Sequence, residues 1–155
     1  MDRYKLLEGV DTRRALFGLF FTFDNRLQTA GDAFYEEITC KQFFLLICMY
    51  LFVDNPPTIS ELAELMGSSH QNVKQLVNKL QERGFVRTYL DETDKRKLRV
   101  VATEKKYELG EKYKEKEIDF MNRFYAGVTE EEIEATFKTI SKIESNLVKI
   151  REEFR

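Results

Sequence analysis

The sequence predicts a mainly α-helical fold with one small β-hairpin, and three observations lead to this prediction. Apolar residues recur every three or four positions over most of the chain, strand-like alternation is confined to about residues 85–101, and helix-start sequences begin at residues 58, 68 and 129. The chain has 155 residues, 43% hydrophobic and 34% charged, which fits one soluble globular domain. We therefore expect residues 1–155 to form a single domain.

The first two expected helices are strongly apolar. The first covers about residues 11–31 and has one apolar stripe with two further aromatic residues beside it: Leu16, Leu19, Phe20, Phe23, Leu27 and Ala30, then Phe17 and Phe21. The apolar run 43–53 follows, and its eleven residues are fewer than the roughly 20 that a membrane-spanning helix needs. We therefore expect a core helix there, ended by Pro56-Pro57, and no membrane partner.

Residues 58–84 predict two short helices joined by a tight turn. Thr58 and Glu61 have the spacing of a capping box, Gly67 ends the first helix, and a second box, Ser68-Ser69-His70-Gln71, begins a helix that ends before Gly84. Each helix has one apolar stripe at positions i, i+3, i+4 and i+7: Ile59, Leu62, Ala63 and Met66, then Val73, Leu76, Val77 and Leu80. Such a pair is a helix-turn-helix, with the second helix over 69–83.

The outer face of the second helix is polar. Opposite its apolar stripe are Gln71, Gln75, Asn78 and Glu82, flanked by Lys74 and Lys79. Gln and Asn can hydrogen-bond adenine in the major groove, Lys can reach guanine or phosphate, and the helix N-terminus with its serines is a suitable phosphate site. The alternative is an ordinary polar helix face, where these residue types are common.

Two short strands follow, over about residues 85–90 and 96–101, joined by a polar turn. A hairpin directly after a helix-turn-helix is a wing, here over 86–101, and Arg96 near its tip is suited to a minor groove. Asp94 is awkward for phosphate contact, so we expect it to orient a nearby basic side chain. The alternative is a solvated hairpin tip.

Basic charge is concentrated in this part of the chain. Residues 68–100 hold eight Lys and Arg against four Asp and Glu, a net charge of +4, which leaves −6 for the remainder of a chain of net charge −2. A basic patch on an acidic body suits a protein that binds nucleic acid, although a solvated charged face has the same composition.

These residues resemble the MarR family of winged helix-turn-helix transcriptional regulators. The resemblance rests on Ile59 to Ala63, Gln71-Asn72-Val73, Leu80, Gly84-Phe85-Val86, the Asp94-x-Arg96 of the wing, and Thr103 opening the next helix. Two positions depart from the family pattern: Ala102 stands where Leu is usual, and Lys106 where Gly is frequent. The resemblance implies a homodimer that presents two recognition helices to a pseudo-palindromic operator, most simply as a ligand-released repressor.

The flanking segments independently favour a dimer. A charge-rich helix is expected over about 103–126, and a capping box at Thr129 opens a last helix with an apolar stripe: Ile133, Phe137, Ile140, Ile143, Leu147, Ile150 and Phe154. We expect residues 1–35 and 104–155 to form dimerisation helices around a DNA-binding region at 36–103. The alternative is that the two termini pack against each other within one chain.

The expected contacts to double-stranded DNA come from the second helix and the wing: Ser68, Ser69, His70, Gln71, Asn72, Lys74, Gln75, Asn78, Lys79, Lys95, Arg96 and Lys97. The resemblance also implies a crevice for a small aromatic or anionic effector, for which the candidate residues are Phe17, Phe20, Phe21, Phe44 and Ile47, with Phe43 and Tyr50 nearby. Aromatic stripes at helical spacing are more often plain core than ligand sites.

Other functions find little support. Cys40 and Cys48 on one helix would lie about 12 Å apart, too far to form a disulfide with each other, and the peroxide-sensing Cys of some relatives has no counterpart in the first helix. His70 is the single histidine, and neither a metal-ligand pattern nor a phosphate loop is visible, so we expect no enzyme, metal or cofactor. No export signal is visible, which predicts a cytoplasmic protein. The competing hypothesis is a winged helix that binds protein instead of DNA.

Overall fold

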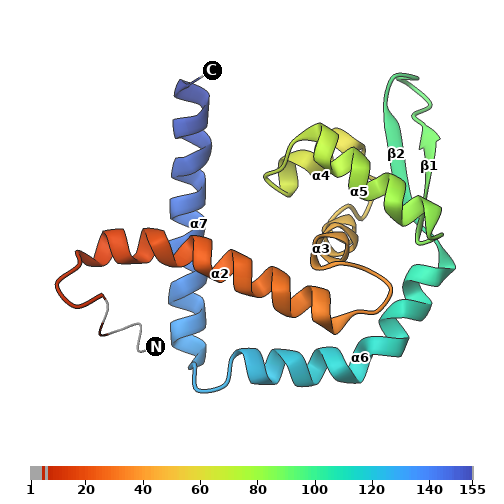
Figure 1. The fold of residues 1–155 in the computed structure, drawn as a ribbon. Coiled ribbons are helices and arrows are strands. Elements are labelled where there is room, and N and C mark those ends of the chain that lie inside the picture. Colours follow the sequence, from red (N-terminus) through yellow and green to blue (C-terminus); the bar gives the residue numbers. More distant parts are fainter. Residues whose placement is uncertain (1–4, 6, 155) are drawn as a thin grey trace. The chain divides into compact units, whose positions relative to one another are not determined.

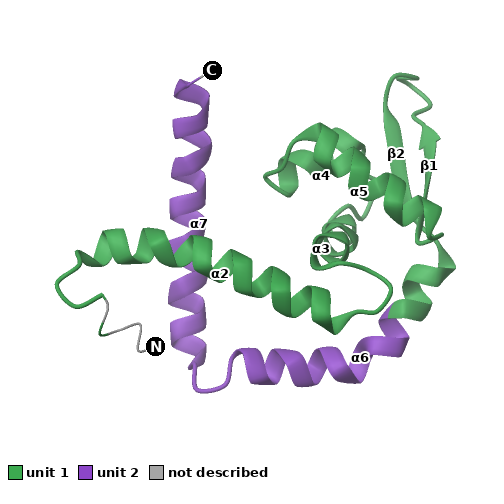
Figure 2. Ribbon diagram, viewed as in Figure 1, with its two compact units in different colours: residues 1–109 green, residues 110–155 purple. Residues whose placement is uncertain are grey.

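The computed structural model describes residue 5 and residues 7–154, and it divides into two compact units, residues 1–109 and 110–155 (Figure 2). The first unit holds α2 (Thr12–Phe34), α3 (Cys40–Met49), α4 (Ile59–Leu65), α5 (His70–Glu82), β1 (Val86–Leu90) and β2 (Leu98–Ala102) (Figure 1). α6 (Glu104–Phe124) begins in the first unit and continues in the second, which also holds α7 (Glu130–Glu153). The predicted fold class, mainly α with one hairpin, is confirmed.

α2 and α3 meet at a glycine. A Cβ atom at Gly31 would stand 2.5 Å from Sγ of Cys40, so only glycine allows this approach. The Asp32 carboxylate accepts a hydrogen bond from the Cys40 amide at 2.7 Å, which joins the end of α2 to the start of α3. Thr39 and Gln42 form a capping box at that start, a motif the sequence analysis overlooked.

The expected end of α3 at Pro56-Pro57 is wrong. The helix ends at Met49, because the amides of Tyr50, Leu51 and Phe52 bond three residues back, to the carbonyls of Ile47, Cys48 and Met49. This tightening closes the helix before the turn-forming Asp54-Asn55 segment is reached. Leu51 and Val53, expected in a core helix, are exposed.

α4 and α5 form the predicted helix-turn-helix. Thr58 and Glu61 make the expected capping box. Gly67, at φ +60°, ends α4 with the Ser68 amide bonded to the Ala63 carbonyl at 2.9 Å, the pattern of a Schellman motif. The second box was misplaced by one residue: Ser69 caps α5 and accepts from the Asn72 amide at 3.2 Å, which leaves Gln71 on the outer face.

The hairpin pairs β1 and β2 in antiparallel register, with Val86 opposite Ala102, Thr88 opposite Val100 and Leu90 opposite Leu98. Both observed strands differ slightly from the expected bounds of 85–90 and 96–101. Residues 91–97 form the loop of the wing.

The core of the first unit lies where α3, α4, α5 and the hairpin meet. It contains Leu45, Leu46, Ile59, Leu62, Val73, Val77, Leu80, Phe85, Val86 and Val100. The predicted apolar stripes of α4 and α5 supply much of this core, with Met66 and Leu76 only partly covered. The burial of these stripes fixes which face of α5 points outward.

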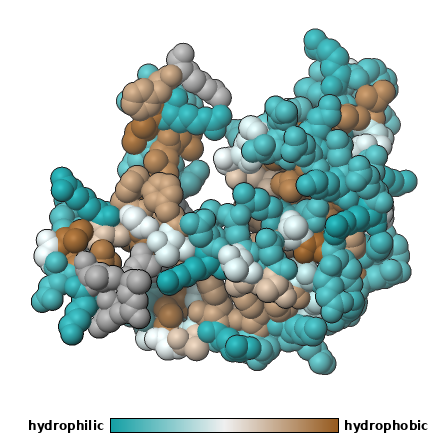
Figure 3. Space-filling view, viewed as in Figure 1, coloured by the Kyte–Doolittle hydropathy of each residue, from teal (hydrophilic) through white to brown (hydrophobic). Residues whose placement is uncertain are grey.

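α2 and α7 differ from the helices of the core, because neither contains a buried residue. Figure 3 shows hydrophobic side chains at the surface along α7, whereas the surface over α4, α5 and the hairpin is largely hydrophilic. The capping box at Thr129 is present as predicted. Within residues 7–154, no helix combines the length and apolar character that a membrane crossing requires. Most of the residues on which the expected lack of an export signal rests lie outside the described part.

Candidate nucleic-acid interface

The outer face of α5 is exposed as the sequence predicted. Gln71, Asn72, Lys74, Gln75, Asn78 and Lys79 are all exposed, while Val73, Val77 and Leu80 on the opposite face are fully buried. Because the buried stripe anchors α5 to the core, the rotation of the helix about its axis is fixed and its polar face remains free of the chain's own core. This arrangement suits insertion into a groove.

The N-terminus of α5 is also accessible. Ser69 and His70 are exposed and Ser68 is half-buried. Ser69 satisfies the amide of Asn72, so the other free amides of the first turn and the positive end of the helix dipole face outward. Such an end can bind a phosphate.

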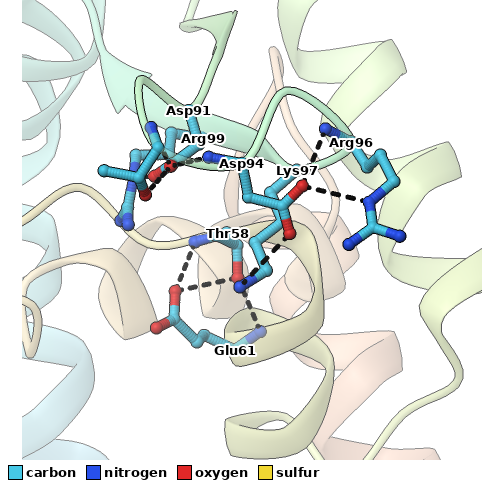
Figure 4. A network of polar contacts seen from close by, with 8 residues as sticks. Thr58, Glu61, Asp91, Asp94, Arg96, Lys97 and Arg99 are labelled. Atoms are coloured by element: carbon cyan, nitrogen blue, oxygen red, sulfur yellow. Dashed lines mark hydrogen bonds and ion pairs between the residues drawn. The ribbon is translucent and has the colours of Figure 1, made fainter.

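The wing tip carries Lys95, Arg96 and Lys97, all exposed. The Asp94 carboxylate accepts from the Arg96 amide at 3.1 Å and from Arg96 Nε at 3.2 Å, and it lies 3.8 Å from Lys97 Nζ (Figure 4). These bonds hold the pKa of Asp94 below its usual range, with the Arg96 side chain the first cause. The geometry is the one expected of Asp94 as a support, and its role in DNA binding stays a prediction.

Sequence reasoning missed a second ion pair, between Asp91 and Arg99. Arg99 Nε donates to Asp91 Oδ2 (Figure 4). Arg99 Nη1 donates to the carbonyl of Pro56. Hydrogen bonds from Thr93, Asp94 and Arg99 hold the pKa of Asp91 well below its usual range. The spacing of Asp91 and Thr93 is typical of a turn and could have indicated the first of these roles. Nothing in the sequence indicated the contact between Arg99 and Pro56, which are 43 positions apart.

Two contacts fix the hairpin relative to α5. Thr88 Oγ1 donates to Gln81 Oε1 at 2.8 Å, and Thr103 Oγ1 donates to the Gly84 carbonyl at 2.6 Å. Gly84, at φ +79°, lets the chain turn sharply from α5 into β1. These contacts hold the base of the hairpin against the C-terminal end of α5.

The candidate effector residues are not plain core of the chain. Phe17, Phe21, Phe44 and Ile47 are 63, 62, 45 and 41% exposed, and Phe20 is half-buried. The interpretation of these side chains as ordinary core is therefore wrong for the first four. Phe17 and Phe21 contact each other edge to face at 5.2 Å between ring centroids.

Both cysteines lie on α3. Burial raises the pKa of both thiols, and Asp32 contributes to the rise at Cys40. Reactive thiols have a lowered pKa, so neither environment favours a redox role. Residue 5 and residues 7–154 contain no cluster of three side chains suited to a metal.

Comparison with known proteins matches part of the chain to a family model and most of it to solved structures. Residues 48–97 match the model of the MarR family. A MarR protein from Peptoclostridium difficile superposes with a TM-score of 0.78 at 20% identity, covering 95% of each chain. The MepR–DNA complex of S. aureus gives 0.72 at 21% identity over 83% of this chain and 95% of that chain. Streptococcus pneumoniae FabT in complex with DNA gives 0.63 at 19% identity over 90% and 99%. No curated protein matches the chain in sequence.

Proposed function

We propose that this protein, whose residues 48–97 match the model of the MarR family, is a sequence-specific DNA-binding transcriptional regulator. The observation that carries the proposal is the outer face of α5: six polar or basic side chains are exposed beside a wing tip with three basic ones. The fold shared with the DNA complexes of MepR and FabT supports it further.

In this proposal α5 enters the major groove. Gln75 and Asn78 lie on the outward face and can make paired hydrogen bonds to adenine, which specify sequence. Lys74 and Lys79 flank them and contact phosphates, which fix position. Ser69 lies at the helix N-terminus, where a phosphate accepts hydrogen bonds from the exposed amides. The full proposed contact set is Ser68, Ser69, His70, Gln71, Asn72, Lys74, Gln75, Asn78, Lys79, Lys95, Arg96 and Lys97.

The wing places Arg96 at the adjacent minor groove. Its side chain is bonded to Asp94 and is 92% exposed, so its guanidinium remains accessible to the negative potential of the groove. Asp94 restricts the conformations of Arg96 before binding, which reduces the entropy lost on contact.

The protein acts as a homodimer in this proposal. α2 and α7 carry large exposed apolar side chains, among them Phe17, Phe137 and Leu147, which a second copy can cover. Two recognition helices related by a twofold axis would read half-sites about one helical turn apart. The expected oligomerisation segments, residues 1–35 and 104–155, contain both helices.

The proposal further includes release from DNA by a small aromatic or anionic effector. The protein then acts as a repressor in the cytoplasm. The exposed aromatic side chains of α2 and α3, Phe17, Phe21 and Phe44, offer apolar contacts to such a molecule. Its binding would change the operator affinity through the dimer. Titration of the protein–DNA complex with benzoate and salicylate tests this part, and unchanged affinity with both contradicts it for simple aromatic acids.

The central test is DNA binding across a salt series. The protein is incubated with random-sequence duplexes, bound DNA is selected over several rounds, and the affinity for the enriched duplex is measured by fluorescence anisotropy. We expect a pseudo-palindromic consensus and an affinity that falls steeply as salt rises. Lack of binding at low salt, or no enriched sequence, would defeat the proposal and favour the protein-interaction module, which keeps the fold without reading DNA.

A further inference from the structure

Arg99 joins three segments of the first unit. It lies on β2 with its side chain 23% exposed, and its Nε donates to the Asp91 carboxylate (Figure 4). Its Nη1 donates in another direction, to the Pro56 carbonyl. Asp91 begins the wing loop and Pro56 lies just before α4. One side chain therefore bonds the wing loop to the segment that leads into the helix-turn-helix.

The two carboxylate oxygens of Asp91 bind different partners, one on β2 and the other in the wing loop. Oδ2 accepts from Arg99, while Oδ1 accepts from the Thr93 amide at 2.9 Å, the Thr93 hydroxyl at 2.6 Å and the Asp94 amide at 2.8 Å. The Asp91 side chain is only 6% exposed. The turn that leads to Asp94, and so to Arg96, is thus built on a carboxylate whose position depends on Arg99.

The backbone around Arg99 continues the connection. The Val100 amide donates to the Pro57 carbonyl at 2.8 Å, and Thr58 and Arg99 form an antiparallel bridge, so residues 57 and 58 lie along β2. Thr58 caps α4, and α4 packs against α5. An unbroken series of contacts therefore runs from the wing tip through Arg99 to the recognition helix.

We propose that Arg99 is a positioning residue that sets the wing relative to α5, so that Arg96 and the recognition helix meet adjacent grooves of the same duplex. This inference rests on the proposed function. Arginine is required because its planar fork reaches two acceptors at once, whereas a lysine ammonium has no fixed geometry for both the carboxylate and the carbonyl. Without Arg99 the wing loop retains its own pairs with Asp94, and the contacts of Thr88 and Thr103 still hold the base of the hairpin, but the loop loses its fixed orientation relative to α5.

The test is a double-mutant cycle on the duplex enriched by the wild-type protein. Arg99→Met removes both bonds and keeps a long apolar stem, and Arg96→Ala removes the wing-tip cation. We expect Arg96→Ala to weaken binding at least about tenfold in the wild-type background and less than about threefold in the Arg99→Met background. Arg87→Met, which removes an exposed arginine from β1, is the matched control and should leave the Arg96→Ala effect unchanged. An undiminished effect of Arg96→Ala beside Arg99→Met overturns the proposal.

Amide hydrogen exchange tests the same inference without DNA, so it remains informative if the proposed function fails. The Asp94 amide donates to Asp91 Oδ1, and the Lys97 amide donates to the Asp94 carbonyl. Both amides should exchange at least about tenfold faster in Arg99→Met, while exchange at the amides of α5 stays unchanged. Unchanged exchange at Asp94 and Lys97 overturns the proposal. If the amides of α5 also exchange faster in Arg99→Met, the experiment is repeated with Arg99→Lys. Exchange at the Asp94 and Lys97 amides of Arg99→Lys as slow as in the wild type would then overturn the proposal.

Discussion

Arg96→Ala separates the wing's contact with DNA from its contribution to the fold. The Arg96 side chain is 92% exposed and its partner Asp94 27% exposed, with 3.2 Å between Nε and the carboxylate oxygen. A pair so accessible to water contributes at most about 1 kcal/mol to stability. We therefore expect the free energy of unfolding to change by less than about 1 kcal/mol.

The expected effect on binding is larger. If Arg96 contacts a narrow minor groove, each subunit loses about 1–3 kcal/mol of binding free energy, roughly 5- to 150-fold in affinity per half-site. Each subunit also releases about one counterion fewer, so the slope of log K against log salt should fall by about 1.8 for a dimer on two half-sites.

The assay is fluorescence anisotropy on the enriched duplex at several salt concentrations, with urea unfolding of the same samples. Arg87→Ala removes an equal charge from the exposed side of β1 and serves as the control, with only a small loss of affinity expected. Unchanged affinity and slope in Arg96→Ala would refute the assignment of the wing tip to DNA. A large loss of unfolding free energy would instead refute the view of the Asp94–Arg96 pair as a surface contact.

Four further predictions concern the recognition helix, the dimer and two ionisable groups. Gln75→Ala should relax preference at one base pair by roughly 1–3 kcal/mol, seen in a repeated library selection, and an identical consensus would contradict direct readout. Phe137→Glu, at a side chain 72% exposed, should yield a monomer by light scattering at micromolar concentration, whereas a dimer mass would argue against α7 as the interface. Asp91 has a lowered folded pKa, so its contribution to stability is fully present above its ordinary value of 3.8 and is lost as pH falls from there through the folded value. Urea unfolding from about pH 7 down to about pH 2 should show the first part of this loss, and an equal loss in Asp91→Asn would contradict it. Burial lowers the pKa of Lys106, whose Nζ lies over the Tyr50 ring, so the folded state disfavours its charge. Lys106→Met should therefore raise the urea midpoint at neutral pH, by an amount that shrinks as pH rises toward 10.5, and an unchanged or lowered midpoint would contradict this account.

Local signals explain most of what the sequence predicted correctly. The capping boxes at Thr58 and Thr129 need only residues three apart, and the buried stripes of α4 and α5 need only helical periodicity. The errors also have local causes: two adjacent serines both fitted an N-cap, and an apolar run concealed the early end of α3. The Arg99–Pro56 contact is different, since no pattern within the sequence relates two residues 43 positions apart.

An apolar stripe predicts that a helix will be covered but does not identify what covers it. The stripes of α5 and α2 look alike in the sequence, yet Val73, Val77 and Leu80 are fully buried within the chain and no residue of α2 is buried. Keeping side chains such as Phe17 and Phe21 in water is unfavourable by about 25 cal/mol per Å² of apolar surface, so the chain gains free energy when a second copy or a ligand covers them. The same aromatic residues are therefore candidates for both the dimer interface and the effector site. Phe17→Ser should change the oligomeric mass, the response to the effector, or both. If neither changes, α2 belongs to neither site.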